Sequence, residues 1–200
     1  MSGQDLEFLV EYSVVGGRQY PIVIVKDDAE TVAQTLRARR DKIYGNIFSE
    51  APTDMRWSGE LGEMCLDAWL AVVGVPHRML TDDHGAGKPD CFVREQSVGM
   101  KAVKRKVPII VPRSGEIYSA QISERHVREP VQWYFFCSYE FPRRAMWLLG
   151  GLEKEVFLNR AKQHKEGDKV HENYTVRKGH EIRNLDIQHL YSAQEWVDRL

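Results

Sequence analysis

The chain changes character at Gly74 and Pro76, where a helical pattern gives way to a series of short strand-like segments. Before that point, residues 58–73 carry one apolar face at helical spacing, formed by Leu61, Cys65, Trp69 and Val72. The strand-like segments after it are rich in β-branched and aromatic residues and cover 78–81, 90–93, 99–106, 116–123, 132–141 and 145–151. A helix followed by a run of strands predicts a mixed α/β (α+β) fold, with a central mixed sheet flanked by helices.

The two ends of the chain predict additions to this sheet. Residues 5–14 and 19–26 have extended character, and Gly16-Gly17 between them suits a hairpin turn. A helix over 29–48 follows, with Asp27 or Asp28 as its expected cap. The C-terminal part predicts a helix at 152–163, a strand at 173–178 and a short helix capped by Ser192.

We expect a single domain over residues 1–200, because one hydrophobic core accommodates a chain of this length. Within it, 1–50 would form an N-terminal hairpin and helix extension, 55–150 the core, and 151–200 a C-terminal helix and strand elaboration. Apolar residues make up 42% and charged residues 28%, which disfavours disorder.

The chain has no apolar run near the roughly 20 residues that a bilayer helix needs, and its first residues lack the pattern of a secretory leader. Three widely spaced cysteines, Cys65, Cys91 and Cys137, do not suit a disulfide framework. We therefore expect a cytoplasmic protein without a membrane partner.

One constellation of side chains points to chemistry. Glu60 and Glu63 lie in the predicted helix, and Pro89-Asp90 opens a later strand. Lys101 lies in the next strand along the chain. Carboxylates from two elements can hold Mg²⁺ (or Mn²⁺), which polarises a phosphate and activates a water. A nearby lysine can stabilise the charge that builds up during phosphodiester hydrolysis.

A helical glutamate, then PD, then a lysine on the neighbouring strand resembles the PD-(D/E)XK nuclease superfamily, which has the restriction-endonuclease-like fold. Glu63 stands two residues before Cys65-Leu66 and six before Trp69-Leu70, and so resembles the GE-x-x-φ-x-x-W-L helix of that family. The resemblance implies that Glu63, Asp90 and Lys101 are catalytic. It also implies that Asp90 and Glu63 hold the metal, with Glu60 in reserve.

The strand register decides which lysine faces Asp90. A turn centred near Gln96-Ser97 would place Asp90 opposite Val103, with Lys101 as its diagonal neighbour on the same face. A slip of one residue would bring Lys104 to that face instead. We expect Lys101, because the lysine of the superfamily sits early in this strand, and Lys104 remains the alternative.

The chain departs from the family at Gly99, two residues before Lys101, where the family has its third acidic residue. Two explanations stay open. The metal is held by Asp90, Glu63 or Glu60 with water and a backbone carbonyl, or the site is degenerate and the domain binds without cutting.

Basic residues gather around the proposed site, although the whole chain is nearly neutral, with 28 Lys+Arg against 29 Asp+Glu. We expect a nucleic-acid groove lined by Lys104, Arg105, Lys106, Arg113, Arg125 and Arg128. His126 lies in the same segment and could assist proton transfer, although a surface loop histidine is the simpler interpretation.

The sequence therefore predicts a metal-dependent endonuclease acting on DNA, with RNA as a second substrate class, and it leaves a homodimer open. The alternative is a catalytically degenerate nuclease-fold module that binds nucleic acid or a protein partner without cutting. A scaffold subunit with no nucleic-acid role is a third class. Cleavage, or salt-sensitive binding without cleavage, distinguishes these three hypotheses.

Overall fold

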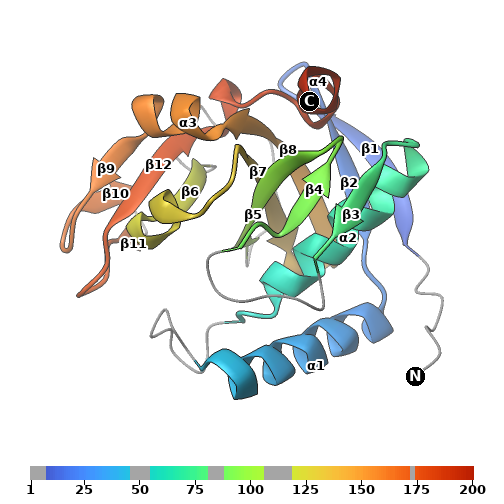
Figure 1. Cartoon of the computed structure of the whole chain (residues 1–200), viewed down its shortest axis with the longest axis horizontal. Coiled ribbons are helices and arrows are strands. Elements are labelled where there is room, and N and C mark those ends of the chain that lie inside the picture. Colours follow the sequence, from blue (N-terminus) through green and yellow to red (C-terminus); the bar gives the residue numbers. More distant parts are fainter. Residues whose placement is uncertain (1–7, 46–54, 81–87, 106–118, 172–173) are drawn as a thin grey trace.

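A seven-stranded mixed sheet forms the centre of the protein (Figure 1). The computed structural model describes residues 8–45, 55–80, 88–105, 119–171 and 174–200. In their order across the sheet, the strands are β1 (Leu9–Val15), β2 (Arg18–Ile24), β8 (Ala145–Glu153), β7 (Trp133–Glu140), β5 (Gln96–Arg105), β4 (Cys91–Val93) and β3 (His77–Met79). All neighbouring strands are antiparallel except β5 and β7, which are parallel.

Helices and a smaller sheet surround this sheet (Figure 1). The helices are α1 (Asp27–Tyr44), α2 (Ser58–Val72), α3 (Lys154–Arg160) and α4 (Ala193–Arg199). A three-stranded sheet is formed by β6 (Ser119–Ser123), β12 (Ile182–Asp186) and β9 (Lys162–His164), and β10 (Lys169–His171) pairs with β11 (Tyr174–Thr175). Three short 3₁₀ helices, η1 (Glu124–Arg128), η2 (Phe141–Arg143) and η3 (Ile187–His189), complete the described elements.

The central strands separate two apolar clusters because successive side chains of a strand point to opposite faces. Phe135 and Cys137 of β7 pack on one face with α2 and α4. Tyr134 and Phe136 pack on the other face with α3 and the smaller sheet. All eight residues of β7 are buried, which explains why its sequence reads as a continuous apolar run rather than as an alternation.

Gly62 brings α2 close to the sheet. A Cβ atom added at this position would lie 2.9 Å from both the Cys137 Sγ and the Met100 Cε atoms, so a larger residue would push the helix away. Met100 and Ala102 therefore face α2, while Gly99 and Lys101 lie on the opposite face of β5. This close contact sets the position of Glu63, the next residue of α2.

Most of the predicted elements are confirmed. The hairpin of β1 and β2 turns at Gly16 and Gly17, which both have positive φ angles. The helices at 27–44 and 58–72 and the strands of the core lie within a few residues of the predicted ranges. Ser192 caps α4 as expected and exchanges hydrogen bonds with Glu195 in a capping box.

Other expectations were wrong. Lys26, not Asp27 or Asp28, is the N-cap residue of α1, and it makes no side-chain cap bond. The helix predicted at 152–163 ends at Arg160, and the residues after it form β9. The strand β12 was not predicted, because its sequence Ile-Arg-Asn-Leu-Asp is largely polar and its pairing with β6 and β9 decides its structure.

Among the helices that the structure describes, none is both long enough and apolar enough to cross a bilayer.

Candidate functional site

Asp90 and Gly99 face each other across β4 and β5. Cys91 pairs with Val98, and the Asp90 N–H donates to the Val98 carbonyl at 2.9 Å, which places Asp90 opposite residue 99. The register predicted from the sequence, with Asp90 opposite Val103, was wrong. The turn is made by Arg94 and Glu95 instead, both at positive φ, a conformation more often taken by glycine or asparagine.

Lys101 is nevertheless the lysine beside Asp90. The register differs from the expected one by four residues, an even number, so the same alternate side chains face Asp90. The Lys101 Nζ atom lies 3.9 Å from the Asp90 Oδ2 atom. The same oxygen accepts a hydrogen bond of 2.6 Å from the Met100 N–H, which fixes the carboxylate against β5. Lys104 falls on the α2 side of β5 and is not part of this contact.

Glu129 is a second carboxylate at Lys101. It lies between η1 and β7, and its Oε2 and Oε1 atoms are 2.9 and 3.2 Å from the Lys101 Nζ atom. A Cβ atom built on Gly99 would lie 3.3 Å from Glu129 Oε2. The carboxylate of Glu129 therefore borders the space that a side chain at position 99 would enter.

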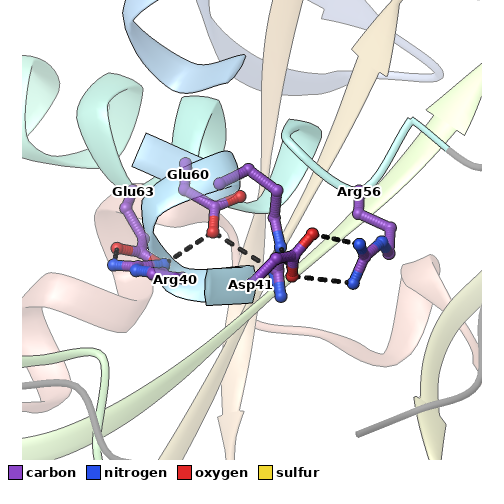
Figure 2. A network of polar contacts seen from close by, with 6 residues as sticks. Arg40, Asp41, Arg56, Glu60 and Glu63 are labelled. Atoms are coloured by element: carbon purple, nitrogen blue, oxygen red, sulfur yellow. Dashed lines mark hydrogen bonds and ion pairs between the residues drawn. The ribbon is translucent and has the colours of Figure 1, made fainter. Parts of the chain in front are cut away.

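Glu63 and Glu60 bind arginines of α1 (Figure 2). The guanidinium of Arg40 donates to Glu63 Oε1 and Oε2 at 3.1 and 2.9 Å, and to Glu60 Oε1 at 2.8 Å. Arg37 adds a bond of 3.1 Å to the same oxygen of Glu60. Figure 2 also shows Asp41 of α1 paired with Arg56. Both carboxylates are buried, so α1 supplies the charge that balances them.

The titration properties of the site follow from burial. Burial, and then the charge of Asp90, raise the pKa of Glu63 to about 7, although Arg40 opposes this shift. Burial also raises the pKa of Glu129; Lys101 opposes that shift, whereas Asp90 adds to it. Asp90 is thus within electrostatic range of a carboxylate on each face of the sheet.

His126 has a structural role in η1. Its Nδ1 atom accepts a hydrogen bond from the Ser123 N–H in a capping box, and its Nε2 atom lies 3.8 Å from Glu129 Oε1. Burial, and then Lys101, hold the pKa of His126 well below its usual value. The ring is therefore neutral, with its proton on Nε2 facing Glu129.

Asp90 and Glu129 are the carboxylates of this site that are placed to hold a divalent cation. No three His, Cys, Asp or Glu side chains in the described parts of the chain are grouped as a metal-binding set. Mg²⁺, however, is commonly held by one or two carboxylates, water and substrate phosphate oxygens. Asp90 and Glu129, with Lys101 between them, meet that requirement, whereas Glu63 has both oxygens on Arg40.

Some of the basic residues predicted to line a nucleic-acid groove lie within the described parts of the chain. Arg125 and Arg128 are exposed on η1, the turn that precedes Glu129, and Lys104 is half-buried on β5. Lys106 and Arg113 lie outside the described residues, as does the side chain of Arg105.

Sequence analysis missed two residues of the site, Glu129 and Arg40. Glu129 is 28 positions from Lys101, and an acid before a proline carries no signal for such a contact. Arg40 lies in the run Arg-Ala-Arg-Arg, which is typical of an exposed helix face.

No family model, no curated protein and no solved structure matches the chain.

Proposed function

We propose that this protein is a metal-dependent nuclease that hydrolyses phosphodiester bonds of DNA, with a restriction-endonuclease-like core. The proposal depends on one observation. Asp90 is held by the Met100 N–H at 2.6 Å, and its Oδ2 atom lies 3.9 Å from the Lys101 Nζ atom. A fixed carboxylate next to a lysine supplies one metal ligand and the positive charge that metal-assisted phosphoryl chemistry uses.

In this proposal Asp90 binds Mg²⁺ or Mn²⁺ through its carboxylate. The ion, when bound, would polarise the phosphate and lower the pKa of the attacking water. Lys101 orients that water and stabilises the negative charge on the phosphate oxygens. One P–O bond forms to the water oxygen, the bond to the leaving oxygen breaks, and a proton passes to the leaving oxygen.

The sequence predicts Glu63 as a second metal ligand with Glu60 in reserve; in the structure both bind Arg40, so Glu63 could reach an ion only if Arg40 released one of its oxygens. Both are buried next to the guanidinium of Arg40, which already occupies the place of a cation.

The charge beside the site supports a nucleic-acid substrate. Arg125 and Arg128 are exposed on η1, next along the chain to Glu129. Arginines in this position can bind the phosphates that flank the scissile bond. We propose DNA as the substrate and RNA as the competing class in the assay.

The test is cleavage by the full chain. Supercoiled plasmid, single-stranded DNA and single-stranded RNA are incubated with the protein in Mg²⁺, Mn²⁺ or EDTA. We expect cleavage with either metal and none in EDTA. Asp90→Asn and Lys101→Met should each lower the rate by about a hundredfold or more. Lys162→Ala, on the exposed part of β9, is the matched control and should cleave like the parent.

A second candidate function, binding without cleavage, is favoured by a specific observation. Glu63 has both oxygens on Arg40, and the ammonium of Lys101 is paired with Glu129. A protein of this kind would bind DNA equally in EDTA and in Mg²⁺, with an affinity that falls steeply as salt rises. Cleavage by the parent that Asp90→Asn abolishes would exclude it.

A further inference from the structure

Position 99 of β5 has no side chain at the point where β5 faces Asp90. The space beside it is filled from another part of the chain, because Glu129 Oε2 lies 3.3 Å from where a Cβ atom of residue 99 would be. The other atoms near that position belong to the ring of Tyr134, at 3.3 and 3.4 Å. The structure thus places a carboxylate next to Gly99 without using β5 to carry it.

The backbone holds Glu129 in this position from both sides. Its N–H donates to the His126 carbonyl at 3.0 Å. Its carbonyl accepts from the Lys154 Nζ atom at 2.6 Å and from the Val131 N–H at 2.9 Å. The fixed backbone of Glu129 limits where its side chain can lie, which lowers the conformational entropy that is lost when it binds a ligand.

The ammonium of Lys101 lies between two carboxylates. Its Nζ atom is 2.9 Å from Glu129 Oε2 and 3.9 Å from Asp90 Oδ2. The two acids therefore already share one cation, and their side chains are 15% and 22% exposed, although the Glu129 Oε2 atom is itself buried. This differs from Glu63, which is enclosed with Arg40 on the other face of the sheet.

We propose that Glu129 is the carboxylate that position 99 lacks, and that a divalent cation binds between Asp90 and Glu129. This inference rests on the proposed function. It resolves the gap in the motif without requiring a degenerate site. In the simpler alternative, Glu129 only forms an ion pair that fastens the turn before β7 to β5.

The first test measures Mn²⁺ binding to the full chain by calorimetry and by electron paramagnetic resonance. Glu129→Gln keeps the size of the side chain and removes its charge, and we expect it to weaken Mn²⁺ binding by about tenfold or more. Asp90→Asn should weaken it at least as much. Glu155→Gln, in the exposed first turn of α3, is the matched control and should bind like the parent.

The second test places the carboxylate on β5, at position 99, instead of at position 129. In the double variant, Glu129→Ala removes the carboxylate beside position 99, and Gly99→Asp supplies a new carboxylate from β5. We expect this variant to recover Mn²⁺ binding and cleavage that Glu129→Ala alone has lost. Gly99→Asp alone should bind Mn²⁺ less well than the double variant, because its side chain meets Glu129.

The outcomes separate this inference from the proposed function. Loss of Mn²⁺ binding in Glu129→Gln, with recovery in the double variant, supports the inference. If Glu129→Gln binds Mn²⁺ and cleaves like the parent while Asp90→Asn does neither, Glu129 is structural and the inference is overturned, although the nuclease stands. If the parent neither binds Mn²⁺ nor cleaves, both are overturned. Circular dichroism melting of each variant identifies a change that acts through unfolding alone.

Discussion

Arg40 donates to both carboxylate oxygens of Glu63, at 3.1 and 2.9 Å, and thereby joins α1 to the helix that carries the candidate site. The same guanidinium binds Glu60 at 2.8 Å. Arg40 thus binds two buried acids from a helix outside the sheet, and Arg37 adds a second bond to Glu60. This contact makes α1 part of the electrostatics of the site rather than a peripheral addition.

Removing Arg40 should therefore destabilise the protein in a pH-dependent way. Arg40→Ala leaves two buried carboxylates with less compensation, which costs about 3 kcal/mol or more at pH 8. The loss should shrink near pH 5, where Glu63, whose pKa is raised to about 7, takes up a proton. Urea unfolding at the two pH values measures it, with the exposed Arg39→Ala as control. An equal loss for both variants would show that the Arg40 contacts contribute nothing specific.

Glu63 should make stability fall as pH rises. Its pKa is about 7 in the folded protein against an ordinary 4.5, mainly because it is buried. Between these values the folded carboxyl binds more protons than the unfolded one, so the free energy of unfolding decreases with increasing pH. The stabilisation is complete below pH 4.5 and lost as pH passes 7, and it amounts to about 3 kcal/mol at most.

Urea unfolding in EDTA from pH 4.5 to 7.5 measures this contribution. Glu63→Gln cannot titrate, so its stability should change less with pH over this window than that of the parent. Parallel curves for the two proteins would contradict the raised pKa of Glu63.

Two glycines of α2 should respond in opposite directions to alanine. Gly62→Ala places a Cβ atom 2.9 Å from Cys137 Sγ and Met100 Cε, and we expect a loss of about 1–3 kcal/mol together with lower cleavage. Gly59→Ala meets nothing within 4 Å and should gain up to about 1 kcal/mol from helix propensity. Thermal melting compares them. A stabilised Gly62→Ala would mean that α2 does not need this close contact.

Arg128 should contribute to DNA affinity without sequence preference. Arg128→Ser should weaken binding to different sequences alike and reduce the slope of log affinity against log salt by about 1. Fluorescence anisotropy between 50 and 200 mM salt measures the slope, and Arg160→Ser at the end of α3 is the control. Unchanged slopes in both variants would place the DNA elsewhere on the protein.

Much of the fold could be predicted from the sequence, because several elements are marked by strong local sequence patterns. The paired glycines of the first hairpin and the apolar face of α2 depend only on neighbouring residues, although Val72, expected on that face, is exposed. The turn between β4 and β5 was misplaced because Arg94 and Glu95 adopt positive φ without the residues that usually mark such a turn.

The sequence predicted the site residues that lie on strands next to each other along the chain. It did not predict the residues that tertiary packing brings to the site. Asp90 directly precedes β4, and Lys101 lies on β5. The predicted position of the turn was wrong, but the register differs by an even number of residues, so Lys101 still lies on the same face as Asp90. Glu129 and Arg40 reach the site through tertiary packing, from segments 28 and 23 residues away from their partners. Nothing in their local sequence distinguishes them from surface charges.

The most direct test of the account is where a metal ion binds. Crystals of the full chain are soaked in Mn²⁺, and anomalous diffraction locates the ion. We expect a peak about 2 Å from carboxylate oxygens of Asp90 and Glu129, with the Lys101 ammonium displaced from between them, and no peak in Asp90→Asn. An absence of anomalous density at Asp90 in the parent protein, under conditions in which the protein cleaves DNA, would contradict it.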